Sequence, residues 1–302
     1  HPVDRRQRQM CIRDRITAML ADETAGRLTI GDQAITVTGA ITVDNANLLG
    51  ATTTGKLTAT IATTETVTEL VTLSADGGTN DLTIVIRAAD ATVATATQLN
   101  TINAATALAV DLTNVTALAG SSLSDLETFA SAVNANEFSN DSGLTTIAVT
   151  DTTIDATTLA STIDSYDGIN GGGTTDMTLA SGATINVDAG EITAMLADES
   201  LGRLTISDQA ITVNSAATIS VDTANLLEAT TTGVVTASIA TTEAVSELNT
   251  LTGTNGAYTI VVAAGDATST TAAQLNTLNG KTTVAVDLTN VTALAGSSLS
   301  DL

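Results

Sequence analysis

The chain has 302 residues and a formal net charge of −23 at pH 7; hydrophobic residues make up 43% of it and aromatic residues only 1%. Affinity for nucleic acid comes mainly from Lys and Arg that neutralise phosphates, so this charge argues against nucleic acid as a partner. No apolar run approaches the roughly 18 residues of a membrane-spanning helix, and we expect no membrane insertion. The hydrophobic share still allows a core, which must be built from Ala, Leu, Ile and Val.

The N-terminal stretch differs from the rest of the chain. Residues 1–15 hold five of the ten Lys and Arg residues, together with the only Cys, Pro and His. Back-translated, Arg5–Asp14 fits codon for codon the transposon adapter used to prepare sequencing libraries, so residues 5–15 resemble a translated adapter. We therefore expect residues 1–15 to be an artefactual, disordered tail on a metagenomic fragment whose true N-terminus is missing. Without these five Arg and two Asp, the remaining residues carry a net charge of about −26.

The rest of the chain contains two long copies of one repeat. The sequence ITAMLADETAGRLTIGDQAITV from Ile16 returns with few changes from Ile192, and Ala109–Leu126 returns letter for letter as Ala285–Leu302. Such self-similarity indicates a repeat architecture. The predicted units are the first repeat, residues 16–191, and a second, truncated copy, residues 192–302.

Short segments with Leu, Ile or Val on alternate positions predict strands that are buried on one face. In chain order these segments are Arg27–Ile30, Lys56–Ile61, Leu82–Ile86, Leu108–Leu112, Thr145–Val149, Ala183–Val187, Arg203–Ile206, Val234–Ile239, Tyr258–Val262 and Val284–Leu288.

Helical patterns lie between these strands. In residues 155–166 the apolar side chains recur at helical spacing, and Asp155 stands at the N-cap position. Residues 114–133 keep a 3.6-residue apolar stripe, which predicts another helix. Asp90 and Asp266 stand before the equivalent helical segments of the two copies, and we expect both to act as N-caps.

Roughly six strand–helix cycles fill the first repeat, which gives coils of about 29 residues. Successive strands joined by helical crossovers should be parallel. The predicted fold is therefore an α/β solenoid with a parallel strand ladder on one face and short helices on the other. A helix-free right-handed β-solenoid is the alternative, because Thr-rich segments have low helix propensity.

The residue types exclude most catalytic sites. No His or Cys follows residue 15, so Ser-His-Asp triads, Cys-His dyads and imidazole or thiolate zinc sites are absent. A pair of carboxylates could still cleave glycosides. Sugar sites, however, usually use aromatic platforms, and the chain has only two Tyr and two Phe. We therefore expect no enzyme and no catalytic or cofactor-binding residues.

Calcium is the one cofactor left open, because it needs only oxygen ligands. Acidic, Gly-containing turns occur at Asp76–Asp81, Asn140–Gly143 and Asp164–Asp176, but the first has lost its carboxylates in the second copy. No confident metal ligand follows from these turns. The weak calcium candidates are Asp141, Asp164, Asp167 and Asp176.

The abundance of threonine raises the hypothesis of ice binding through outward Thr-x-Thr pairs. Thr58 and Thr60 form such a pair, but Thr83 is followed on the same face by Val85, so the ladder is broken. Threonine also simply suits the exposed face of a strand. Ice binding is therefore the weaker hypothesis.

The segment AAQLNTLNGKTTVAVDLTNVTALAG, Ala272–Gly296, and its partner in the first copy resemble giant bacterial extracellular repeat proteins. These are adhesins or motility-associated cell-surface proteins, including those of marine cyanobacteria. The resemblance implies an extracellular or cell-surface structural or adhesive segment without catalysis, whose partners are the neighbouring repeats and a cell-surface or glycan ligand. A Ca²⁺- or glycan-binding module is the alternative.

Overall fold

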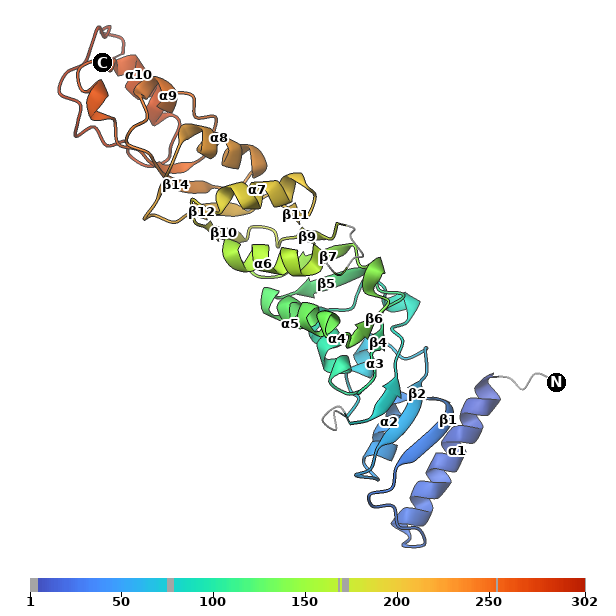
Figure 1. Ribbon diagram of the computed structural model, residues 1–302. Helices are drawn as coiled ribbons and strands as arrows, with labels where there is room; N and C mark the ends of the chain where they lie inside the picture. Colours follow the sequence, from blue (N-terminus) through green and yellow to red (C-terminus); the bar gives the residue numbers. More distant parts are fainter. Residues whose placement is uncertain (1–4, 75–78, 168, 170–173, 254, 302) are drawn as a thin grey trace. The chain divides into compact units, whose positions relative to one another are not determined.

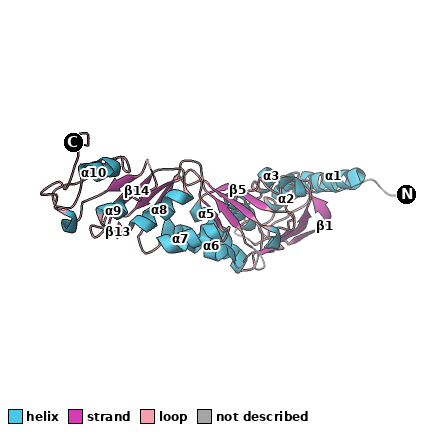
Figure 2. Cartoon of the chain, turned by 90° about the horizontal axis from the view of Figure 1, so that it is seen from above, coloured by secondary structure: helices cyan, strands magenta, loops and turns pink. Residues whose placement is uncertain are grey.

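The computed structural model describes residues 5–74, 79–167, 169, 174–253 and 255–301 of the chain (Figure 1). The chain divides into two compact units. The first unit contains residues 1–148 and 164–175, and the second contains residues 149–163 and 176–302. In both units helices alternate with short strands along the chain (Figure 2).

Among the described residues of the first unit, the pairs β1–β2, β2–β3 and β4–β6 are parallel. One sheet has the order β1-β2-β3, β4 pairs with β6, and β5 lies beside β7. The strands are β1 (Ile35–Ile41), β2 (Leu57–Ile61), β3 (Asp81–Thr83), β4 (Val110–Asp111), β5 (Ala117–Ser121), β6 (Phe138–Ser139) and β7 (Thr146–Val149).

Short helices connect the paired strands of the first unit. Helix α2 packs on β2, and α4 packs on β5 and on α5. The helices are α1 (Arg5–Thr24), α2 (Val43–Gly50), α3 (Val67–Leu70), the 3-10 helix η1 (Ala88–Asp90), α4 (Ala96–Asn103), α5 (Leu123–Asn134) and the 3-10 helix η2 (Asp141–Gly143).

The second unit repeats this arrangement. One parallel sheet has the order β13-β14-β12-β10-β8 with β15 also on β14, and β9 pairs with β11. The strands are β8 (Thr153–Asp155), β9 (Asp176–Thr178), β10 (Thr184–Val187), β11 (Leu204–Thr205), β12 (Ala210–Val213), β13 (Thr218–Ile219), β14 (Val235–Ile239) and β15 (Ala257–Thr259). The helices are α6 (Ala156–Asp167), which ends beyond this unit, α7 (Ile192–Ser200), α8 (Val221–Thr230), α9 (Val245–Leu248), η3 (Ala264–Asp266) and α10 (Ala272–Asn279).

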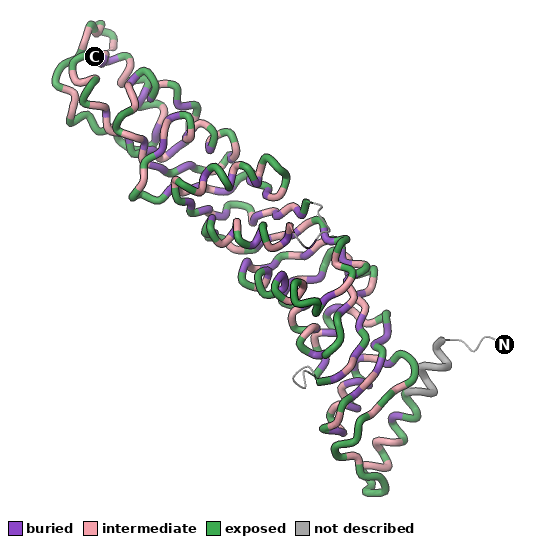
Figure 3. Tube along the Cα trace, viewed as in Figure 1, coloured by how far each residue is buried: buried purple, intermediate pink, exposed green. Residues whose placement is uncertain are grey.

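The register of the strands builds the core. In the second unit Ile154 pairs with Ile185, Ile185 with Ile211, and Ile211 with Val235. All four side chains are fully buried. These four strands thus place aliphatic side chains directly beside one another in the sheet, and buried segments recur along each unit (Figure 3). The expected α/β fold with parallel strands is confirmed, and the helix-free alternative is wrong.

Ser and Thr side chains start most of the short helices. Thr66, Thr95 and Thr271 each form a capping box. The N-cap hydroxyl accepts from the backbone amide of the third helical residue, and the side-chain oxygen of that residue accepts from the backbone amide of the N-cap. Asp155 caps α6 as predicted, because its carboxylate accepts from the amide of Thr158 at 3.0 Å. The four-residue helix α3 thus depends on its cap more than on its length.

The prediction that Asp90 and Asp266 cap the helices that follow them is wrong. The helices that follow them start later, at Thr95 and Thr271. Each aspartate instead accepts a hydrogen bond from a helix N-terminus of the preceding coil, Asp90 from the amide of Val67 and Asp266 from the amide of Val245, both at 2.8 Å. Sequence spacing cannot reveal a partner that lies more than twenty residues away.

The helix predicted over residues 114–133 begins later than expected. Residues 117–121 form β5, and α5 starts only after Ser122, whose hydroxyl accepts from the amide of Asp125. Pairing with the adjacent strands decides this segment, because tertiary contacts override a weak helical pattern. Arg27–Ile30 is also no strand, although Leu204–Thr205 in the second copy is one.

The backbone is helical from Arg5, where we expected a disordered tail up to residue 15. Arg, Gln and Met have good helix propensity, so this segment can extend the helix of the first repeat. Among the described side chains of α1, those of residues 13–15 are exposed and Ile16 is the first that is buried. Among the side chains of α1 that the structure describes, burial therefore begins where the repeat begins.

One glycine in each copy allows the coils to approach closely. A Cβ on Gly55 would lie 2.4 Å from the carbonyl oxygen of Asp32, and one on Gly233 would lie 2.3 Å from that of Gln209. No larger residue fits there without a shift of the backbone. The preceding threonines reinforce the contact, since Thr53 and Thr231 each donate to a carbonyl of the preceding coil at 2.6 Å.

Buried threonines tie one coil to the next, and their removal should be measurable. The hydroxyl of Thr106 accepts from the amide of Leu82 at 3.0 Å and donates to the carbonyl of the same residue at 2.8 Å. We predict that Thr106→Val lowers the free energy of unfolding by about 1–3 kcal/mol, because a buried backbone amide loses its acceptor. Urea unfolding measures the loss, with the exposed Thr101→Val as the matched control. Equal effects of the two substitutions would contradict this role.

Candidate functional site

The four weak calcium candidates are spread over several elements. Asp141 lies in η2, Asp164 and Asp167 lie in α6, and Asp176 starts β9. The hydroxyl of Thr205 donates to both carboxylate oxygens of Asp176, at 2.9 and 3.1 Å. Asp164 and Asp167 also have interaction partners. Parts of two predicted turns, residues 75–78, 168 and 170–173, lie outside the described residues.

The described residues contain no group of three or more His, Cys, Asp or Glu side chains that could hold a metal ion. In the acidic turn predicted over Asp76–Asp81, the described residue Asp81 forms an ion pair and is not part of such a group. Its carboxylate forms an ion pair with Lys56 at 3.0 Å, and both side chains are partly exposed. An exposed pair of this kind adds little stability.

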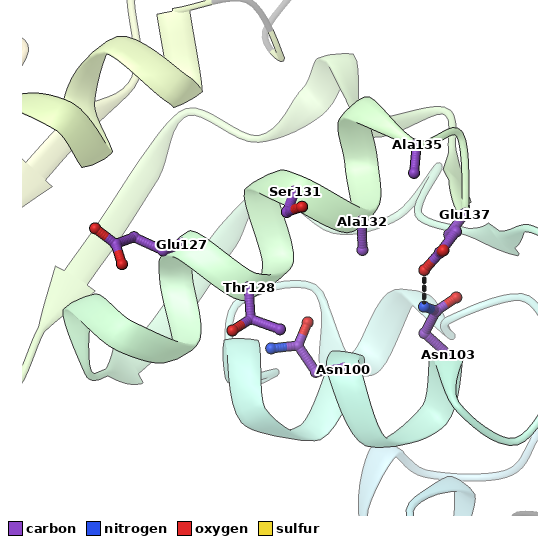
Figure 4. A pocket seen from close by; sticks show the side chains of 8 residues that line it. All are labelled: Asn100, Asn103, Glu127, Thr128, Ser131, Ala132, Ala135 and Glu137. Carbon is purple, nitrogen blue, oxygen red and sulfur yellow. Dashed lines mark hydrogen bonds between the residues drawn. The ribbon is translucent and has the colours of Figure 1, made fainter.

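An open groove with a volume of about 500 Å³ lies between α4 and α5 in the first unit (Figure 4). It combines amides and hydroxyls with small apolar side chains and two carboxylates. The lining residues are Asn100, Asn103, Glu127, Thr128, Ser131, Ala132, Ala135 and Glu137. None of them is a cation, a thiol or an imidazole.

The two carboxylates of the groove do not converge. Glu127 lies near the start of α5, whereas Glu137 follows its end and accepts a hydrogen bond of 2.5 Å from the amide of Asn103 (Figure 4). Glycoside cleavage needs two carboxyl groups that flank one bond. This groove therefore does not supply that chemistry.

Asn100 joins α4 to the next coil. Its side-chain amide donates to the carbonyl of Asp125 at 3.1 Å, while its buried Oδ1 has no hydrogen-bond partner among the described residues. The same bond, always to a carbonyl 25 residues further along the chain, recurs at Asn47, Asn225 and Asn276. The amide is a connection between coils rather than a ligand of the groove.

The role of these asparagines was not predicted from the sequence. The signal was available, because Asn47 and Asn100 of the first copy return as Asn225 and Asn276 inside otherwise apolar helical patterns. A polar residue kept at such a position indicates a hydrogen bond across the helix interface.

A second hollow, of about 270 Å³, lies in the second unit and is lined by three carboxylates, Asp155, Asp188 and Glu191. Each one already holds the local fold. Asp155 caps α6, Asn214 donates to Asp188 at 2.9 Å, and Glu191 accepts from the amide of Asp188 at 3.1 Å. These bonds explain the acidic cluster without a bound cation.

The register also places the threonines of the ice-binding hypothesis. Thr60 pairs with Thr83, but Thr58 pairs with Asp81. The outward face of β2 and β3 therefore carries a mixed row rather than a continuous threonine ladder.

Asp90 is a buried carboxylate that accepts three hydrogen bonds. It is 5% exposed and accepts from Val67 as described above, from Nε of Arg87 at 2.9 Å and from Nη2 of Arg87 at 3.0 Å. Burial opposes ionisation, but the bonds from Arg87 and Val67 outweigh it and lower the pKa of Asp90. In the second copy Ala263 takes the place of Arg87. Asp90 thus has a structural role.

The lowered pKa of Asp90 sets the sign of a pH effect. A carboxylate with a folded-state pKa below its unfolded value of about 3.9 stabilises the fold above that pH, and the stabilisation is lost as the pH falls through the folded pKa. We predict that Asp90→Asn destabilises the chain at neutral pH and flattens the rise of unfolding free energy with pH in the acid range. Chemical unfolding at a series of pH values measures this. Asp222→Asn, at an exposed site, controls for the loss of one negative charge, and an identical acid profile for both variants would refute the effect.

The assignment of carboxylates to structural bonds also predicts how the chain responds to calcium. We expect the melting temperature to be the same in millimolar Ca²⁺ and in EDTA, because a ligand that binds only the folded state would raise it. Scanning calorimetry tests this, with Mg²⁺ as a control for ionic strength. A rise with Ca²⁺ but not with Mg²⁺ would establish a dedicated site.

Comparison with known proteins gives no relative from which a function could be transferred. No protein family model, no curated protein and no solved structure matches the chain. Among the described residues, no helix is both long and apolar enough to cross a membrane.

Proposed function

We propose that this chain is a non-catalytic structural or adhesive repeat segment of a large secreted or cell-surface bacterial protein. The observation that carries the proposal is the repetition of the same coil-to-coil bonds in both copies. The hydroxyls of Thr106 and Thr282 donate to the carbonyls of Leu82 and Tyr258, both at 2.8 Å. The side-chain amides of Asn114 and Asn290 donate to the carbonyls of Ile86 and Val262, also at 2.8 Å. Side chains that could perform chemistry are instead used to join coils.

In this proposal the coils stack as an α/β solenoid, with a parallel strand ladder on one face and short helices on the other. Support comes from the parallel register in each unit, where partners such as Ile185 and Ile211 are one coil apart in sequence. In repeat proteins each coil contacts mainly its neighbours, so copies can be added or removed. A protein of this kind can span a distance and present a surface without an enclosed active site.

The extracellular location rests on composition and on the resemblance to bacterial surface proteins. After the first fifteen residues the chain has no cysteine and a net charge of about −26. A strong charge of one sign keeps long chains soluble and limits self-association. The short aliphatic core explains how such a chain folds with almost no aromatic residues.

Surface labelling tests the proposed location. An antibody raised against residues 16–302 should bind intact cells of the organism that encodes the chain, and permeabilisation should not increase the signal. An antibody against a cytoplasmic protein provides the matched control, since it should label permeabilised cells only. If both antibodies behave alike, the surface assignment is wrong.

A further inference from the structure

Two identical segments of the chain have different surroundings. Ala109–Leu126 and Ala285–Leu302 have the same sequence, and the second is described up to residue 301. On the side of the preceding coil both make the same bonds. The backbone amides of Thr116 and Thr292 donate to the carbonyls of Ala91 (2.9 Å) and Ala267 (2.8 Å). The side-chain amides of Asn114 and Asn290 donate to the carbonyls of Ile86 and Val262, both at 2.8 Å. The hydroxyls of Ser121 and Ser297 accept from the backbone amides of Ala96 and Ala272, both at 2.9 Å.

The opposite side of these segments differs sharply. Leu112 and Leu118 are 1% exposed and Leu123 is 5% exposed in the first copy. The same leucines in the second copy are exposed at 41%, 43% and 93%; these are Leu288, Leu294 and Leu299. We call them the Leu288 face.

The difference does not extend to every apolar side chain of the segment. Leu108, which directly precedes the first copy, is 40% exposed, and its counterpart Val284 is 37% exposed. At this position the exposure is therefore nearly the same in both copies.

The first copy shows what covers these leucines. Strand β6 pairs with β4, so that Val110 lies beside Phe138. The amide of Val110 donates to the carbonyl of Glu137 at 3.0 Å, and that of Leu112 donates to Ser139 at 2.8 Å. Phe138 is 4% exposed.

The covering coil continues beyond β6. Leu144 and Ile147 are fully buried, and the amide of Thr145 donates to the carbonyl of Thr116 at 2.9 Å. Asn140 adds a polar contact, because its amide donates to the carboxylate of Asp111 at 3.0 Å. The cover is thus residues 127–149, which combine apolar side chains with backbone donors and acceptors.

In the described part of the second copy, Val286 and Leu288 form no counterparts of the bonds that Val110 and Leu112 make to Glu137 and Ser139. Their segment is nevertheless already held in place by the preceding coil. We propose that the Leu288 face is a docking surface for a coil of the Glu127–Val149 type, that is, a further coil of this same repeat. In this arrangement Asp287 accepts a hydrogen bond from the counterpart of Asn140 in the docked coil, as Asp111 does from Asn140 in the first copy. The inference rests on the coil stacking proposed above and not on the cellular location.

The repeated sequence provides an internal standard for the test. The identical segments have nearly identical intrinsic exchange rates, so amide hydrogen exchange reports their protection directly. Fragments that include the unlike flanking residues, Ala107–Leu108 or Thr283–Val284, distinguish the two copies by mass. In the unaltered chain we expect Val286 and Leu288 to exchange at least about ten-fold faster than Val110 and Leu112.

The decisive variant carries residues 127–167 of this chain appended after Leu302, which continues the repeat in phase and includes Tyr166 beside Phe129. We expect it to slow exchange at Val286 and Leu288 to the rates of Val110 and Leu112. The matched control carries the same extension with Phe138→Ser, Leu144→Ser and Ile147→Ser in the appended copy, and it should leave these amides unprotected.

Three outcomes would overturn the proposal. Equal protection by both extensions would show that added length, not the apolar coil, covers the face. No protection by the native extension, while Val110 and Leu112 stay protected, would show that the face does not accept this coil. Protection in the unaltered chain that grows with protein concentration would identify a second molecule as the occupant. Loss of protection at Val110 and Leu112 themselves would instead contradict the coil stacking of the proposed function.

Discussion

The paired strands of each unit give one another backbone partners and apolar cover, in a parallel register. Ile154, Ile185, Ile211 and Val235 stack on one another because their strands pair residue for residue. Small aliphatic side chains can form a core in this way, since each contributes little area but the stack is continued by every further coil. Polar side chains strengthen the same contacts, as Thr106 and Asn100 do for the strands and helices of the first unit.

Burial consequently depends on the neighbouring coil and not only on a residue's own sequence. The pair Asp22–Arg27 is exposed in the first copy, whereas its counterpart Asp198–Arg203 is largely buried in the second. Residues 127–191 of the first repeat, which have no counterpart in residues 192–302, add aromatic side chains to the core, where Phe129 packs against Phe138 and Tyr166 with ring centroids 4.8 and 6.3 Å apart. The Tyr166 hydroxyl donates to the carbonyl of Leu126, and burial raises its pKa.

The sequence was sufficient to predict a mixed α/β fold with parallel strands and several of the strands, because alternation in segments such as Lys56–Ile61 reflects burial within one strand. It could not predict bonds that cross from coil to coil. Asp90 was therefore assigned to the wrong helix, and the first part of residues 114–133 was predicted as helix instead of β5. The calcium candidates followed from acidic, Gly-containing turns, whereas the carbonyl of Asp125 that Asn100 binds could not be identified from the sequence.

A deletion of one coil tests the central claim most directly, because coils that pack only on equivalent neighbours can be removed whole. Removing residues 185–210 joins Thr184 to Ile211, which already occupies the register position of Ile185 in the next strand. The account predicts that this variant keeps its circular dichroism spectrum per residue and unfolds cooperatively. Removal of residues 185–197, which leaves half a coil, should abolish cooperative unfolding of the second unit. Loss of structure in both variants, or its retention in both, would contradict the account.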